Sequence, residues 1–328
     1  LDNNGQTNGL AGEDINATEI WDDYRGEGVI ISIVDDGLDH EHPDIEDNYE
    51  PTYSYDWCND DSDPAPSDWN GHGTAAAGVA AATGNNSLYV SGAAWEATLA
   101  GSTLIACWAS DSTEADALSF ENDNIDIYSN SWGPSDDGST LEGPGPLTLA
   151  AFEEDAYWGR GGLGNSITWA AGNGLGSDDN ANKDGYANSR FTIAVTAITH
   201  EGDQSYYAEP GANILVAAHS NGDGEGITTT DITGSGGYNG SGNVTHTFGG
   251  TSSATPLAAG VIALMYDANE DLTWRDVQEI LLRTARMNDL ADSSWNTNGA
   301  GHDVSHKYGF GAVDAGAAVS MALNWTTL

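Results

Sequence analysis

The 328-residue sequence has very few basic side chains. Eight Lys and Arg residues stand against 51 Asp and Glu residues, which gives a formal net charge of −43. Such a chain is a poor partner for nucleic acid, because the phosphates would be repelled. The imbalance favours basic peptides and metal cations as partners, or a solvated acidic surface of the kind that keeps a protein soluble in salt.

Cysteines and long apolar runs are also scarce. The two cysteines, Cys58 and Cys107, exclude a disulfide framework but are compatible with one bridge or with two free thiols. No stretch approaches the ~20 apolar residues that a membrane-spanning helix needs. The sequence begins at Leu1 without an initiator Met or a signal peptide, so we expect a processed or engineered start.

Strand and helix patterns alternate along the chain, which predicts an α/β fold with a mostly parallel sheet and helices on both faces. No linker divides the sequence, so residues 1–328 are expected to form a single domain. The expected strands cover 28–34, 125–129, 167–171 and 191–198, and the expected helices cover 74–83, 254–265 and 274–287, with another helix ending at 153–159. Polar, glycine-rich segments at 57–70, 175–185 and 219–243 are expected to be loops.

One serine stands between a tight glycine turn and a helix of small residues, in the segment 249–256. The Ser252 hydroxyl is therefore expected at a helix N-terminus, where free N–H groups stabilise negative charge. A nucleophilic serine needs a base and a group that orients the base. His72, next to a predicted helix, and Asp35, at the end of a predicted strand, supply them. Asn173, between two glycines, is expected to donate to an oxyanion together with the Ser252 N–H.

These residues follow the order Asp, His, Ser that is found in subtilisins. Together with further motifs they make the chain resemble the subtilisin-like serine proteases of peptidase family S8, and within them the kexin/furin branch of proprotein convertases. The resemblance covers about 11–327 and implies a subtilisin-like three-layer fold. Its motifs are Asp35-Asp36-Gly37, His72-Gly73-Thr74, Tyr128 to Pro134, Gly161 to Gly164, Gly172-Asn173-Gly174, Asp184 to Ser189, Gly250-Thr251-Ser252 and Leu272 to Asp276.

The resemblance implies a substrate groove lined by acids. It assigns Asp136 and Asp184 to the S1 pocket, where a desolvated Arg or Lys side chain at P1 needs carboxylate partners, and Asp36 to the S2 pocket. The loop before His72 lacks the acid that the family has there, which predicts a weaker preference for a basic P2 residue. The remaining implied contacts are the S4 positions Glu114, Glu142 and Tyr186, and the segment Ser131-Trp132-Gly133, which would pair with an extended substrate.

Calcium is the cofactor that the resemblance implies, because loops rich in carboxylates suit a hard cation with oxygen ligands. The alternative for each loop is an ordinary solvated acidic surface. Three sites are implied: Asp136, Asp179 and Glu209 beneath the S1 pocket; Asp56, Asp61 and Asp63 in one loop; and Asp44 and Asn86 with the backbone carbonyls of Thr83, Leu88 and Val90.

The favoured interpretation is therefore a secreted, calcium-dependent serine endopeptidase, a monomer that hydrolyses proteins or peptides after Arg or Lys. In this family an inhibitory propeptide precedes the catalytic domain and a β-sandwich P domain follows it, so both are expected in the full-length protein. Two alternatives remain open. One is a subtilisin of broad specificity with a salt-adapted surface, and the other is a non-catalytic, calcium-stabilised binding scaffold.

Overall fold

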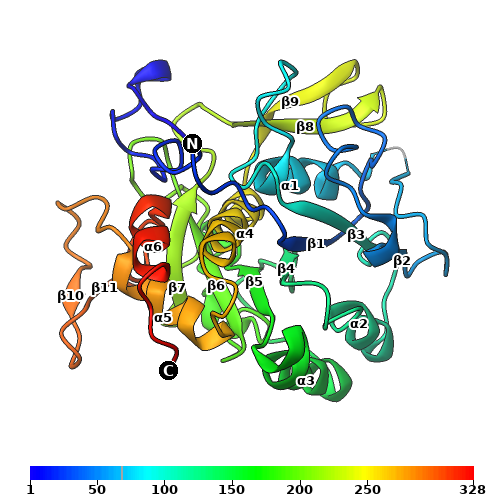
Figure 1. The fold of residues 1–328 in the computed structure, drawn as a ribbon. Coiled ribbons are helices and arrows are strands. Elements are labelled where there is room, and N and C mark those ends of the chain that lie inside the picture. Colours follow the sequence, from blue (N-terminus) through cyan, green and yellow to red (C-terminus); the bar gives the residue numbers. More distant parts are fainter. Residues whose placement is uncertain (68) are drawn as a thin grey trace.

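The computed structural model describes residues 1–67 and 69–328. At its centre is a parallel sheet with the strand order β2-β3-β1-β4-β5-β6-β7 (Figure 1). The strands β3 and β4, which follow each other in the chain, lie on opposite sides of β1, so a crevice is expected at the carboxyl ends of the strands beside β1. The strands are β1 (Ile30–Asp35), β2 (Tyr55–Asp56), β3 (Thr98–Thr103), β4 (Ile127–Asn130), β5 (Ser166–Ala170), β6 (Thr192–Ile198) and β7 (Ile214–His219).

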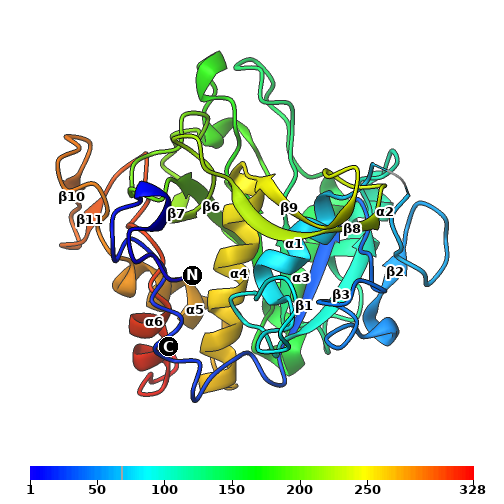
Figure 2. The ribbon, with the colours of Figure 1, turned by 90° about the horizontal axis from the view of Figure 1, so that it is seen from above.

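Helices cover both faces of this sheet, which confirms the expected three-layer α/β fold. Figure 2 shows the long helix α4 between α6 and α1. One apolar core lies under α1 and α4, and a second core lies between the sheet and the pair α2 and α3. The helices are α1 (His72–Ala81), α2 (Asp111–Leu118), α3 (Pro146–Gly162), α4 (Thr251–Ala268), α5 (Trp274–Thr284) and α6 (Ala315–Ala322).

Small residues let α1 and α4 approach each other closely. Both helices are buried along almost their whole length, and Ala and Gly make up most of the buried residues of α1 and five of the fifteen buried residues of α4. A Cβ atom on Gly260 would lie 2.7 Å from the Cβ of Ala93 and 3.0 Å from the carbonyl oxygen of Ala80. A larger residue there would push the two helices apart, and with them the side chains at their N-termini.

The predicted strands and helices are present, with ends that are shifted by a turn or less. The most useful shift is at α1, which begins at His72 itself and not after it. Thr273 caps α5 in a reciprocal capping box with Asp276, as its position before the predicted helix suggested. The predicted loop at 175–185 contains only short 3₁₀ turns. In the predicted loop at 57–70, the described residues form no helix or strand, and residue 68 lies outside the described residues.

The prediction that 219–243 is a loop is wrong. It contains β8 (Ile227–Gly234), which pairs with β9 (Gly242–Phe248) in an antiparallel hairpin beside α1 (Figure 1). Threonines make β8 polar in sequence, but Thr229 and Thr230 are buried and donate their hydroxyls to the carbonyl oxygens of Ala75 and Thr74. A second small hairpin joins β10 (Asn296–Thr297) and β11 (Asp303–Val304).

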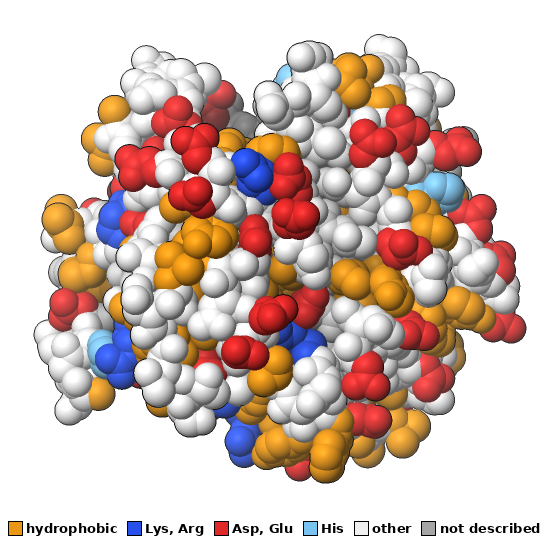
Figure 3. All heavy atoms as spheres, viewed as in Figure 1, with side chains coloured by type: hydrophobic (Ala, Val, Ile, Leu, Met, Phe, Trp, Pro, Cys, Tyr) orange, Lys and Arg blue, Asp and Glu red, His pale blue; other side chains and the backbone are white. Residues whose placement is uncertain are grey.

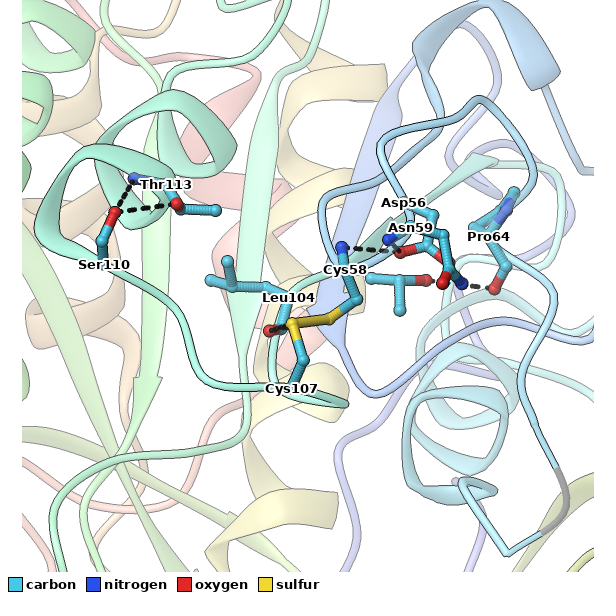
Figure 4. The surroundings of a disulfide bond; sticks show 9 residues. Asp56, Cys58, Asn59, Pro64, Leu104, Cys107, Ser110 and Thr113 are labelled. Atoms are coloured by element: carbon cyan, nitrogen blue, oxygen red, sulfur yellow. Dashed lines mark hydrogen bonds between the residues drawn. A yellow bond between two sulfur atoms is a disulfide. The ribbon is translucent and has the colours of Figure 1, made fainter.

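The two cysteines form a disulfide, which settles the question that the sequence left open. Cys58 follows β2 and Cys107 follows β3, and their Cα atoms are 5.7 Å apart (Figure 4). Acidic side chains are spread over the visible face of the molecule, with few Lys and Arg residues among them (Figure 3). In the described ranges, no helix combines the length and the hydropathy required to cross a membrane.

An ion pair between the buried Glu13 and the half-buried Arg286 fixes the N-terminal segment to the rest of the fold. The Arg286 guanidinium makes two 2.8 Å bonds to the carboxylate of Glu13, and His219 at the end of β7 contacts the same carboxylate. Burial alone would raise the pKa of Glu13, but the hydrogen bonds from His219 and Arg286 outweigh it and lower the pKa to about 2. The folded state therefore favours the ionised form of Glu13.

The Glu13→Gln substitution is expected to destabilise the protein by about 2 kcal/mol at neutral pH, because it leaves the half-buried Arg286 guanidinium without its charged hydrogen-bond partner. Because the pKa of Glu13 is lowered on folding, this contribution is complete above the ordinary pKa of glutamate and is lost as pH falls towards about 2. Melting temperatures of wild type and variant should therefore converge in acid. The matched control is Glu279→Gln, which removes an exposed pair with Arg283 and should cost about 0.5 kcal/mol. Equal effects of both substitutions would contradict the prediction.

Candidate active site

Asp35 and His72 meet at the carboxyl end of β1. Asp35 is the last residue of that strand and is 1% exposed, whereas His72 opens α1. The His72 Nδ1 atom lies 2.8 Å and 2.9 Å from the two carboxylate oxygens of Asp35. This contact fixes the orientation of the imidazole and directs its Nε2 atom away from the carboxylate, as a base oriented by an aspartate requires.

The charges around His72 favour its protonated form. Burial alone would lower the pKa of His72, but the charge and hydrogen bond of Asp35, assisted by Asp36, raise it to about 9. Burial and the neighbouring charge of Asp35 likewise raise the pKa of Asp36 to about 6. The edge of the His72 ring also meets Phe248, with ring centroids 5.4 Å apart. Sequence reasoning missed Phe248, although it stands directly before the glycine turn of Ser252.

Ser252 lies in the first turn of α4, after Gly250 with a φ of 76°. The hydroxyl of Ser252 donates to the carbonyl oxygen of Ser131 at 3.3 Å, and within the described ranges it has no hydrogen bond to His72. Nucleophile–base hydrogen bonds are often long or absent in an enzyme without substrate and tighten when substrate binds. The hydroxyl is thus at the predicted helix start, where its hydrogen bond goes to Ser131.

Asn173 follows β5 and connects it to the start of α4. Its side-chain oxygen accepts hydrogen bonds from the Thr251 N–H at 2.8 Å and the Thr251 hydroxyl at 3.1 Å. This leaves the amide nitrogen on the cavity side, where its contact is a long 3.5 Å approach to Asp136. The amide is therefore held beside Ser252 with its donor available, as the prediction of an oxyanion contact requires.

A cavity of about 140 Å³, called here the S1 pocket, extends from Ser252 and Asn173 to a floor of acidic side chains. Asp136, Asp179, Asp184 and Glu209 all line it. Burial raises the pKa of Asp184 to about 6, with Asp136 and Asp179 adding to the shift. The structure thus brings both predicted S1 acids into one cavity with the predicted nucleophile.

The carboxylate of Asp36 is hydrogen-bonded to the backbone at the start of α1. Asp36, predicted in S2, accepts hydrogen bonds from the N–H groups of His72 at 3.3 Å and Gly73 at 2.8 Å, so it caps the N-terminus of α1.

The segment 131–133 follows β4 along the cavity. A Cβ atom on Gly133 would lie 2.9 Å from an Asp184 oxygen, so a larger residue there would displace the Asp184 carboxylate.

A second cavity of about 340 Å³, called here the distal pocket, shares Trp132, Gly133, Pro134 and Ser135 with the S1 pocket. The predicted S4 residues come together in it. Glu114, Glu142 and Tyr186 all line it, and the hydroxyl of Tyr186 donates to Glu114 at 2.8 Å. Sequence reasoning missed the contribution of residues 104, 105 and 107–109 to the lining of this pocket.

The acidic residues predicted beneath the S1 pocket surround Gly174. A Cβ atom on Gly174 would lie 2.7 Å from the Cβ of Asp179, 2.8 Å from a carboxylate oxygen of Glu209 and 3.1 Å from the Cβ of Asp136. Burial raises the pKa of Glu209 to about 8, and Asp136 and Asp179 add to the shift. This crowding fits a cation, since a positive charge would relieve it. Across the described ranges, however, no three His, Cys, Asp or Glu side chains are placed to share one metal ion.

The other two predicted calcium sets differ from each other. Around Asp44 the predicted residues do gather: Asn86 and the Val90 N–H donate to its carboxylate at 2.9 Å and 2.8 Å, and the Thr83 N–H donates to its carbonyl oxygen. Leu88 donates its N–H to Asn86 in the same loop.

The set Asp56, Asp61 and Asp63 is not brought together by its side chains. Asp56 turns inward, where its carboxylate binds the N–H groups of Cys58 and Asn59. Asp63 instead pairs with His40 at 3.0 Å. The regular spacing of acids in the sequence gave no sign of these competing partners.

Lys183 is a further residue of the S1 pocket that sequence reasoning missed. Its ammonium donates to the carbonyl oxygen of Gly138 at 2.6 Å and lies 3.4 Å from Asp179. With only eight Lys and Arg residues in the chain, a lysine directly before Asp184 was a signal that could have been used. It partly neutralises the acidic floor.

Comparison with known proteins places this geometry in a family. The model of the subtilase family matches residues 26–311. Among curated relatives, furin-like protease 1 (isoform 1-CRR) of Drosophila melanogaster is 45% identical over 322 residues, covering 96% of this chain and 28% of that protein. A PC3-like endoprotease of Hydra vulgaris is 43% identical, covering 99% and 46%, and furin of Bos taurus is 41% identical, covering 98% and 40%. The chain thus spans less than half of the length of each of these relatives.

Solved structures show the same likeness. The serine protease of Aeromonas sobria, in complex with its chaperone, aligns with a TM-score of 0.87 at 26% identity, covering 98% of this chain and 64% of that one. A protease of Pseudoalteromonas arctica aligns with a TM-score of 0.75 at 26% identity and covers 94% of both chains. The chain belongs to the subtilase family, and the resemblance drawn from its sequence motifs is confirmed.

The Asp36→Asn substitution should move the acidic limb of the kcat/KM profile to lower pH by roughly half a unit. The reactive form of His72 is the neutral one, so activity is lost as pH falls through its pKa, which lies above the ordinary 6.5, near 9. Removing the charge of Asp36 removes part of what stabilises the imidazolium. Profiles of kcat/KM against pH measure the shift. The exposed control Asp271→Asn should leave the limb in place, and an unmoved or alkaline-shifted limb for Asp36→Asn would contradict the prediction.

Proposed function

We propose that this chain is the catalytic domain of a secreted, calcium-dependent serine endopeptidase that cleaves proteins or peptides after Arg or Lys. The observation that carries the proposal is one cavity that is lined by both Ser252 and the half-buried carboxylate of Asp184. A basic P1 side chain entering that cavity would reach a carboxylate partner while its carbonyl group meets the hydroxyl. The curated relatives, named furin-like or PC3-like proteases, support the same assignment.

The roles of the reacting groups follow from their positions. Ser252 attacks the scissile carbonyl carbon while His72 accepts its proton, and His72 later gives that proton to the leaving amine. Asp35, 2.8 Å from Nδ1, holds the tautomer and stabilises the imidazolium. The Asn173 amide and the Ser252 N–H donate to the oxyanion, and loss of one such donor typically costs about 3 to 4 kcal/mol of barrier.

Calcium is proposed as a structural cofactor. Asp136, Asp179 and Glu209 would hold it beneath the S1 pocket, where its charge would offset the repulsion among these carboxylates. Asp44, Asn86 and the nearby backbone carbonyls would hold another ion. The scattered partners of Asp56 and Asp63 make the third set the weakest of the three.

The whole protein is proposed to include more than this domain. The curated relatives are more than twice as long, consistent with an N-terminal propeptide and a C-terminal P domain. We propose that residues 1–328 form the single catalytic domain, that it acts as a monomer, and that its partners are substrates with a basic P1 residue. A subtilisin of broad specificity and a non-catalytic scaffold on the same fold are the competing proposals.

Peptide-library cleavage tests the proposal directly. The wild type is expected to cleave after Arg or Lys, and Asp184→Asn should lower kcat/KM for P1-Arg substrates by about 10- to 100-fold, the weight of a lost charged hydrogen bond. The exposed control Asp123→Asn should not change it. Equal cutting after Leu, Phe and Arg would instead support broad specificity. Failure of a fluorophosphonate probe to label Ser252 in folded, calcium-loaded protein would support the scaffold.

Removal of calcium should lower the melting temperature, because a ligand that binds only the native state stabilises it by about 2.7 kcal/mol at 100 times its Kd. Thermal unfolding with added calcium and with excess chelator measures this directly, without reference to activity. Asp179→Asn should reduce the difference between the two conditions, whereas the distant Asp123→Asn should leave it unchanged. Identical melting curves in calcium and chelator would contradict every metal assignment.

A further inference from the structure

The distal pocket is lined by two kinds of side chain. Glu114 and Glu142 supply carboxylates. The segment that joins β3 to α2, here called the 104–110 segment, supplies the exposed apolar side chains of Ile105 and Trp108, whereas Leu104 in the same segment is buried. A cavity lined by both apolar and acidic side chains suits a substrate side chain with a long stem and a charged head.

Trp108 is the most exposed of these apolar residues. It is 87% exposed although it lines the distal pocket, which adjoins the S1 pocket. Exposing so large an apolar surface forgoes the stabilisation that burial would bring. An indole face that the fold does not cover is therefore available to a substrate side chain.

The backbone around Trp108 has few bonds of its own. The N–H groups of Leu104 and Ile105 donate to Asp35, and Ser110 caps α2 at the other end. Between these anchors, residues 106–109 make no backbone–backbone hydrogen bond to any other described part of the chain. Main-chain bonding alone therefore leaves the position of the indole weakly determined.

The disulfide supplies the missing restraint. Cys107 directly precedes Trp108 and is bonded to Cys58, and both sulfur atoms approach the carbonyl oxygen of Leu104 (Figure 4). Cys58 in turn is held by Asp56, which is buried and accepts its N–H at 2.7 Å. The chain of contacts runs from a buried carboxylate, through the disulfide, to the residue before Trp108.

We propose that Trp108 is a specificity-determining residue of the distal pocket and that the Cys58–Cys107 disulfide positions it to stack on an arginine side chain of the substrate. The inference rests on the proposed function, because it assumes that a substrate occupies the groove. Arginine is favoured over lysine, since a planar guanidinium stacks on an aromatic face while its N–H groups pair with carboxylates. Glu114 and Glu142 are the carboxylates within the same cavity.

The test compares three peptides that share a P1 Arg and carry Arg, Lys or Ala at P4. The P4 side chain is the one expected to reach the distal pocket. Trp108→Ala should lower kcat/KM for the P4-Arg peptide about fivefold to tenfold more than for the P4-Ala peptide, mainly through KM. Trp108→Phe should retain most of the preference. The double variant Cys58→Ala/Cys107→Ala should lose the Arg-over-Lys preference at P4 as Trp108→Ala does.

The controls distinguish failure of this inference from failure of the proposed function. Trp158→Ala, which removes an exposed indole from α3, should leave all three rates unchanged. Melting temperatures identify any variant that loses activity because it unfolds. In that case the P4 preference of Trp108→Phe decides between stacking and a merely structural role. Equal losses on the P4-Arg and P4-Ala peptides overturn the inference, while intact P1 cleavage preserves the proposed function. A wild type that does not cleave after Arg overturns both.

Discussion

Side chains at the ends of strands hold the first N–H groups of the two helices that carry the reacting groups. Asp36, after β1, binds the start of α1, and Asn173, after β5, binds the N–H of Thr251 at the start of α4. These hydrogen bonds satisfy donors that any helix leaves free at its N-terminus. They also fix His72 and Ser252 relative to the sheet. Loss of either contact would disturb helix packing and the reacting geometry together.

Negative charge dominates the site as it does the whole chain. The pKa values of Asp36, Asp184 and Glu209 are all raised, because each is buried near other carboxylates. Such crowding costs stability unless a cation offsets it. A basic substrate side chain and a bound calcium ion would each do so, and Lys183 already does so in part. Under the proposed function, the binding of substrate and the relief of electrostatic strain are therefore the same event.

The sequence predicted those parts of the site whose signals are local. Ser252, His72 and Asp35 each lie at the end of a helix or strand that a glycine turn, a run of small residues or a run of apolar residues predicts. The hairpin of β8 and β9 was missed because its threonines pair with α1, which is remote in sequence. The disulfide was undecidable for the same reason, since 49 residues separate its cysteines. Likewise, the family resemblance implied that Asp56 and Asp63 share a calcium ion, whereas the fold gives each carboxylate a different hydrogen-bond partner.

Reacting groups and specificity groups depend on different parts of the fold. His72 and Ser252 stand on helices packed against the sheet, so the main core fixes them. The distal pocket is instead lined in part by the connection between β3 and α2, where main-chain hydrogen bonds are sparse. A loop of this kind tolerates sequence change without cost to the core, but it needs a local restraint to hold a defined shape. The disulfide supplies such a restraint, and it does so without adding to the crowded charges of the groove.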